Sequence, residues 1–184
     1  MQNRRFKFLA AAFSFFLFSS AAYCKDSLPR GFKNIKFGMS IDQVKSELKK
    51  DGNFGFRGDR DVSLLPGENR TLIETDTAKT APYSILERCM FQFYEDKLYT
   101  IIITMRRSKM DHYSVYTTIA EKYGDPDSMN PEKCEWKDDG TIMSLERPLT
   151  LKYTDRSVFE ELQSKAMVNK TAEEESKQDF LDSL

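Results

Sequence analysis

The sequence is poor in the residues on which most metal sites and many enzymes depend. It holds one histidine and three cysteines among 184 residues. Without a second histidine, a zinc site would need cysteines and carboxylates, and no short ligand spacing indicates one. A glycine-rich phosphate loop and a nucleophile elbow are both missing from the sequence. These absences favour a protein that is not an enzyme and that binds no metal ion and no cofactor.

The single histidine, His112, falls on the apolar stripe of a predicted helix. A histidine in such a position is more often a half-buried, hydrogen-bonded side chain than a catalytic group or a metal ligand. We therefore expect His112 to have a structural role.

An excess of one charge is also missing, because 28 basic residues face 29 acidic ones. Bulk electrostatics therefore predict no nucleic-acid binding. The length allows one domain of ordinary size. We place this domain at residues 25–168, and we expect the polar stretch 169–184 to be a disordered tail.

A long hydrophobic run occurs only near the start, at Phe8–Phe18. This run is shorter than the roughly 20 residues that span a bilayer. Arg4, Arg5 and Lys7 precede it and small residues follow, which is the pattern of a secretory signal peptide. We therefore predict a signal peptide at residues 1–24 and an exported, periplasmic protein.

The processing site leaves two alternatives open. Cleavage could follow Ala22 or Cys24, and Cys24 could instead be lipidated, although Tyr23 fits a lipidation box poorly. Only lipidation would attach the protein to a membrane. In an oxidising compartment the other two cysteines, Cys89 and Cys134, are candidates for a disulfide; two separate buried thiols are the alternative.

A β-hairpin at Leu86–Met105 is the element around which the chain is organised. Two runs rich in aromatic and β-branched residues flank the polar pair Glu95-Asp96. This is a hairpin pattern, although Glu-Asp is not a strong tight-turn sequence and a longer loop is possible. The second run is apolar on both faces around Ile102, so we expect a central strand. Further strands are predicted at 34–37, 54–57, 62–65, 71–74, 134–137, 141–145 and 149–153.

Three helices are predicted from cap and stop signals. Ser40 and Gln43 form a capping box for the first, which Gly52 ends. Ser108 is expected to cap the second, which Gly124 ends. Thr154 or Asp155 is expected to cap the third. The order of elements indicates an α+β fold in which the helices pack on one face of an antiparallel β-sheet meander.

The opposite face of such a sheet would be free to contact a partner. Tyr99 and Trp136 are most simply core residues, but either becomes a candidate contact if it points outwards. Arg106 and Arg107 form a basic cluster before the second helix. They could meet an anionic partner or lipid, or simply lie at a solvated end of the sheet.

The stretch Gly38-Met39-Ser40-Ile41-Asp42-Gln43-Val44 resembles the opening signature of the small outer-membrane-assembly lipoproteins of the SmpA/OmlA (BamE) family. Tyr123-Gly124-Asp125-Pro126 is similar to the Gly-x-Pro that ends helices in that family. The wider resemblance is to exported domains like the β-lactamase inhibitor protein. It implies helices on one face of an antiparallel sheet and a non-catalytic envelope module that works through protein contacts.

Two functions from different classes follow from these features. The first is an exported, non-enzymatic module that binds another envelope protein as a scaffold or assembly accessory. The alternative is a periplasmic protein that holds a lipid or small apolar ligand between sheet and helices. An enzyme ranks third, because the sequence gives no sign of convergent catalytic side chains.

Overall fold

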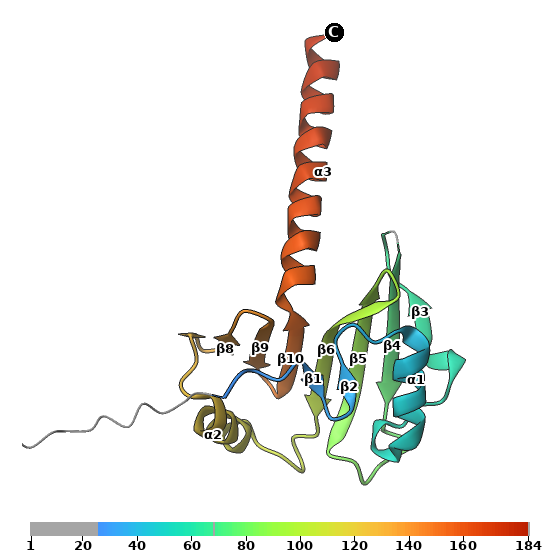
Figure 1. Cartoon of the computed structure of the whole chain (residues 1–184), viewed down its shortest axis with the longest axis vertical. Coiled ribbons are helices and arrows are strands. Elements are labelled where there is room, and N and C mark those ends of the chain that lie inside the picture. Colours follow the sequence, from blue (N-terminus) through green and yellow to red (C-terminus); the bar gives the residue numbers. More distant parts are fainter. Residues whose placement is uncertain (1–25, 68, 184) are drawn as a thin grey trace, which may run out of the picture.

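The computed structural model describes residues 26–67 and 69–183 and has an α+β architecture (Figure 1). The predicted signal peptide and Cys24 lie outside these residues. The described helices are α1 (Ile41–Lys50), α2 (His112–Tyr123) and α3 (Arg156–Asp182), with short 3-10 turns at Gly52–Phe54 and Asp59–Asp61. The described strands are β1 (Gly31–Phe32), β2 (Ile35–Lys36), β3 (Val62–Leu64), β4 (Arg70–Asp76), β5 (Leu86–Tyr94), β6 (Lys97–Met105), β7 (Ser128–Met129), β8 (Lys133–Lys137), β9 (Thr141–Glu146) and β10 (Thr150–Asp155).

Strands β3 to β10 form one antiparallel sheet of order β3-β4-β5-β6-β10-β9-β8-β7. Two meanders, β3 to β6 and β7 to β10, therefore meet between β6 and β10. Helix α2 makes the connection between them and carries the chain from the centre of the sheet to its far edge. The predicted α+β fold with an antiparallel sheet is confirmed.

The predicted β5–β6 hairpin lies at the centre of this sheet, and its turn is tight. The turn consists of Glu95 and Asp96, whose φ angles are 49° and 60°. Positive φ at both central residues is what a two-residue type I′ turn requires, so no longer loop is needed. The Asp96 side chain also accepts a hydrogen bond from the backbone N–H of Ile41, at 3.0 Å. The turn therefore fixes the start of α1 in addition to joining the two strands.

One face of the sheet carries the core. The strand register aligns a row of buried side chains across it: Ile73, Phe91, Ile101, Tyr153, Met143 and Trp136. The adjacent row on the other face reads Glu74, Met90, Ile102, Lys152, Ser144 and Glu135, which is mostly polar. This alternation is expected for a sheet with one buried face and one solvated face.

Helix α1 closes the core at the β4–β6 end. Ser40 and Gln43 form the predicted capping box, and Val44 and Leu48 are fully buried. Ahead of the helix, the N–H of Gly38 donates to the carbonyl of Leu98, and the N–H of Leu98 donates to that of Met39. The helix start is thus bonded to the central hairpin by backbone as well as by Asp96.

Helix α2 covers the other half of the same face. Its cap is Asp111, which accepts a bond from Ser114 N–H, so the prediction of Ser108 as the cap was wrong. Residues 107–109 form a turn instead. The helix ends at Gly124 as predicted, and the carbonyl of Gly124 accepts a 2.9 Å hydrogen bond from the Trp136 indole. This bond anchors the C-terminal end of α2 to the sheet.

The segment before α1 contributes more to the core than its polar sequence suggested. Leu28 and Ile35 are buried, and the Phe32 ring lies 6.2 Å from Phe54 and 6.3 Å from Tyr153. Arg30 forms a 2.6 Å ion pair with Asp155. The N-terminal segment therefore connects the two halves of the core.

Three further predictions were wrong. Cys89 and Cys134 are both free, and β6, β10 and β9 lie between their strands. Four strand spacings amount to about 19 Å, far beyond the roughly 7 Å limit for a disulfide. The predicted strand at 54–57 is absent from the described chain, because residues 52–54 form a 3-10 turn. The tail from residue 169 is not without structure either, because α3 continues to Asp182.

Candidate functional site

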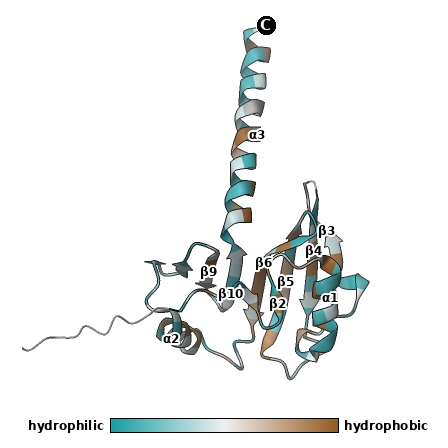
Figure 2. Cartoon of the chain, in the orientation of Figure 1, coloured by the Kyte–Doolittle hydropathy of each residue, from teal (hydrophilic) through white to brown (hydrophobic). Residues whose placement is uncertain are grey.

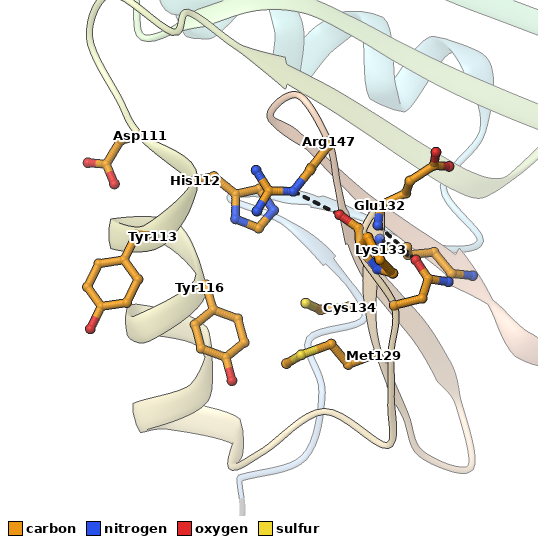
Figure 3. A pocket seen from close by; sticks show the side chains of 11 residues that line it. Asp111, His112, Tyr113, Tyr116, Met129, Glu132, Lys133, Cys134 and Arg147 are labelled. Carbon is orange, nitrogen blue, oxygen red and sulfur yellow. Dashed lines mark hydrogen bonds between the residues drawn. The ribbon is translucent and has the colours of Figure 1, made fainter.

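A groove with a volume of about 700 Å³ lies between the first half of α2 and the β7–β8 hairpin (Figure 3). Its walls combine apolar side chains with a few polar ones. From α2 come His112, Tyr113 and Tyr116; from the hairpin and the following strand come Met129, Pro131, Glu132, Lys133 and Cys134; Arg147 comes from the β9–β10 turn. We call this feature the α2–β7 groove. Its size is typical of a binding site for a small molecule or for side chains of a partner.

The α2 side of the groove is set by the position of the helix cap. Because Asp111 caps α2, His112, Tyr113 and Tyr116 fall in its first two turns. Tyr116 faces Met129 and Cys134 across the groove (Figure 3). The Tyr116 ring also lies 6.2 Å from the ring of Trp136, a core residue. This contact connects the groove to the core. The groove therefore lies next to the core, at a place that α2 does not cover.

Hydrogen bonds within the β7–β8 hairpin hold the opposite wall. The Asn130 side chain accepts bonds from the N–H groups of Glu132 and Lys133, at 2.9 and 2.8 Å. Arg147 is attached to this turn twice, because its N–H donates to the Glu132 carbonyl and its Nε donates to that of Pro131. The guanidinium is thus held at one end of the groove.

Two arginines and one glutamate lie at that end. Arg107, Glu132, Arg147 and Pro148 line a neighbouring hollow of about 560 Å³, which shares Glu132 and Arg147 with the α2–β7 groove. The pKa of His112 is lowered from its usual value of 6.5, first by burial and then by the charge of Arg147. His112 is therefore mostly neutral at pH 7. The positive charge comes from Arg107, Arg147 and Lys133, and Glu132 and Asp111 are the acidic side chains in the same lining.

The rim of the groove exposes large apolar side chains. Tyr113 is 73% exposed and Met129 is 59% exposed. Single exposed apolar residues are common on protein surfaces, but here two of them border the same apolar hollow. Tyrosine, methionine and arginine are also the residue types that are enriched at protein interfaces. The composition of the groove therefore favours contact with another molecule.

The predicted contact residues are distributed differently. Trp136 is fully buried, so it is the core residue that was the simpler expectation and not a partner contact. Tyr99 lies on the sheet face opposite the core but is buried, and its hydroxyl bonds Gln92 at 3.2 Å. Arg106 bonds Ser84 O and Thr77 Oγ1 in a neighbouring loop and so has a structural role. Arg107 alone of the four lies beside the groove, in the adjoining hollow.

Sequence reasoning did not identify Tyr113, Met129 or Arg147. No periodicity distinguishes an exposed tyrosine next to a helix cap from any other surface residue. The three come together only because the connection through α2 returns the chain to the far edge of the sheet. His112 is half-buried, as expected. The sequence did not indicate that it lies in the wall of a groove.

The described residues hold neither a metal site nor a membrane-spanning helix. Within 26–67 and 69–183, no three histidine, cysteine, aspartate or glutamate side chains are grouped so that they could hold a metal ion. Among the helices of this part of the chain, none has the length and apolar character needed to cross a membrane. The α2–β7 groove is thus the best-defined candidate site in the described chain.

Comparison with known proteins places most of the chain in one family. A comparison with curated proteins and one with solved structures each found no significant match. A sequence profile of the TP0088 domain matches residues 30–165, which is more than half of the 184-residue chain. The matched range runs from the segment before β1 to the third turn of α3, and so includes the whole sheet and the groove. The chain therefore belongs to the TP0088 domain family.

Proposed function

We propose that this protein is an exported, non-enzymatic module that binds another protein in the bacterial cell envelope, as a scaffold or assembly accessory. The observation that carries the proposal is the α2–β7 groove, an apolar hollow with exposed Tyr113 and Met129 on its rim and Arg147 at one end. Export is supported by the signal-peptide pattern of residues 1–24.

The groove suits a protein segment that carries an apolar side chain next to an acidic one. Tyr116, Met129 and Pro131 would surround the apolar side chain, while Arg147 and the nearby Arg107 would meet the carboxylate. Such an arrangement, in which a desolvated apolar anchor lies beside a charged contact, is common at the centre of protein interfaces. Two side chains of the groove are held in place, because Tyr116 packs on Trp136 and Arg147 is hydrogen-bonded to the β7–β8 hairpin.

The test is photo-crosslinking from within the groove, in the native host. A photoreactive phenylalanine analogue replaces Tyr113 in one variant and Leu64 in the control. Leu64 is 84% exposed on β3, the edge strand at the other end of the sheet, so it reports chance encounters. We expect a discrete protein adduct from position 113 and none from position 64. Equal adducts from both positions, or none from either, would refute a protein-binding groove.

A second function, binding of a lipid or other small apolar ligand, is favoured by one observation. The volume of about 700 Å³ lies within the usual range for small-molecule sites. The same crosslinking experiment separates the two functions, because a lipid would increase the mass of the monomer by less than about 2 kDa. Such an adduct from position 113 would replace the first proposal with the second.

A further inference from the structure

Helix α3 is the most exposed helix of the described chain. Its 27 residues span about 40 Å, and it projects away from the sheet (Figure 1). Only its first turns contact the domain. Phe159 and Leu162 border a hollow of about 250 Å³ with Tyr99, and Lys165 donates a 3.0 Å bond to the Tyr94 hydroxyl. The TP0088 profile also ends at residue 165.

Beyond Lys165 the helix has little internal support. Lys170 pairs with Glu174 at 3.8 Å, and Gln178 bonds Asp182 at 2.7 Å. Exposed pairs of this kind each stabilise a helix by only about 0.2–0.5 kcal/mol. Helices depend mainly on packing of an apolar face for their stability. A helix that extends this far without such packing is expected to dock on another surface.

The end of α3 carries a distinctive combination of side chains. Phe180 is 64% exposed and Leu181 is 49% exposed. Residues 171–183 hold five acidic residues and one basic residue, with Asp179 and Asp182 next to the apolar pair. We call residues 171–183 the α3 tip. Figure 2 shows how hydrophobic positions interrupt this otherwise hydrophilic helix. The tip is therefore an acidic segment with two apolar anchors.

The α2–β7 groove has the complementary character. Exposed Tyr113 and Met129 stand at its rim. The charged side chains that line it and the adjoining hollow are three basic ones and two acidic ones, namely Arg107, Lys133, Arg147, Asp111 and Glu132, so the basic ones are in excess. The tip cannot reach the groove of its own chain, because α3 is rooted in β10 and extends away from the side on which α2 lies (Figure 1). A second copy of the chain has no such restriction.

We propose that the α3 tip of one copy docks in the α2–β7 groove of a second copy, with Phe180 and Leu181 in the groove and the flanking carboxylates facing Arg147 and Arg107. This inference rests on the proposed function, because it takes the groove to be a protein-binding site and identifies the occupant. Two copies can exchange tips reciprocally to give a dimer. Otherwise each copy engages the next, and a head-to-tail chain results.

The experiment uses the mature protein, three variants of it and sedimentation over a concentration series. The tip variant carries Phe180→Ser and Leu181→Ser, the groove variant carries Tyr113→Ser and Met129→Ser, and the control carries Leu64→Ser. All five replaced side chains are at least 49% exposed, so the fold is expected to persist. We expect the parent and the control to self-associate equally, and each of the other two variants to do so at least tenfold more weakly.

Mixing the tip and groove variants gives the decisive result. In the mixture, the groove variant supplies an intact tip and the tip variant supplies an intact groove. A one-to-one complex of the two variants is therefore expected to form. If both variants fail to associate and their mixture does not recover a complex, the tip and the groove do not bind one another, and the proposal falls. If the groove variant associates as strongly as the parent, the copies pair without the groove, and the proposal falls as well.

A parent protein that stays monomeric up to about 1 mM would also overturn the proposal. The proposed function would survive that result if crosslinking from position 113 still captured another protein. It would fail together with the inference if no discrete protein adduct formed from position 113.

Discussion

The two ends of the sheet are covered by helices of similar length, but with different results. At the β4–β6 end, α1 buries Val44 and Leu48 completely. At the β7–β9 end, α2 buries Ile119 and Tyr123 in its C-terminal half, while His112, Tyr113 and Tyr116 in its first turns border an open groove. We call these the α1 end and the α2 end. One end is a closed core, and the other is a surface with apolar side chains available for contact.

The difference follows from how each helix is attached. The start of α1 is bonded to the central hairpin through Asp96 and through the backbone of Leu98. Helix α2 is bonded to the sheet at its C-terminal end, where the Trp136 indole N–H donates to the carbonyl of Gly124. Its start is capped by its own Asp111. The bonded start of α1 lies beside the central hairpin, whereas the start of α2 borders the groove.

The largest effect that separates the two ends is expected from truncating a ring in each. Phe91 is fully buried at the α1 end, where its ring lies 6.0 Å from Phe54. Phe91→Ala is expected to lower the free energy of unfolding by about 3–5 kcal/mol. Tyr116→Ala at the α2 end is expected to cost only about 1–2 kcal/mol, because the groove already exposes part of the ring. Urea denaturation measures both; equal losses would contradict the contrast.

A smaller difference between the two ends is expected in the rates at which Cys89 and Cys134 are alkylated. Burial raises the pKa of the Cys89 thiol to about 12, so almost no thiolate forms at pH 8. Cys134 lies in the wall of the groove and is nearer to solvent. Thiol alkylation of the native protein is therefore expected to label Cys134 at least about tenfold faster than Cys89. In denaturant both should react at the same rate. Two unreactive thiols in denaturant, restored by reduction, would instead reveal the disulfide that the strand order excludes.

The smallest effect is a pH dependence of the free energy of unfolding that comes from the α2 end, where the single histidine lies. Because the pKa of folded His112 is below the unfolded value of about 6.5, the unfolded chain takes up the proton first as the pH falls. The neutral histidine therefore contributes stability that is fully present above pH 6.5 and is lost as the pH falls through the folded pKa.

The midpoint of urea unfolding, measured at pH 7.5 and pH 5, tests this contribution. His112→Gln should reduce the loss of stability between the two pH values. The carboxylates titrate in both proteins, so only the difference between the proteins reports on the histidine. An unchanged pH dependence in the variant would contradict the assigned environment of His112.

Much of the α1 end could be read from local sequence. The capping box of Ser40 and Gln43, the hairpin around Glu95-Asp96 and the buried alternation of Cys89, Phe91 and Phe93 are all confirmed. Each depends on residues close together in the chain. The failures there were local too: Phe54 and Phe56 alternate like a strand, but the αL conformation of Gly55 allows a turn that buries Phe54.

The α2 end was predicted less well, because its important contacts join residues far apart in sequence. Trp136 is buried by its position opposite Met143 and Tyr116, and Arg147 reaches the groove through the β7–β8 turn. The disulfide prediction failed for the same reason. Two cysteines in predicted strands give no information about how many strands separate them, and that number follows from the strand order.

The sequence by itself determined the kinds of elements, their approximate limits and the alternation that gives the sheet one apolar face. Caps, turns and periodicity act over a few residues, so they are visible in one dimension. The tertiary structure alone decided the strand order, the separation of Cys89 from Cys134, the groove beneath the start of α2 and the isolation of the α3 tip. These features depend on which distant segments pack together, and that choice is made by the free energy of the whole core rather than by any one stretch of chain.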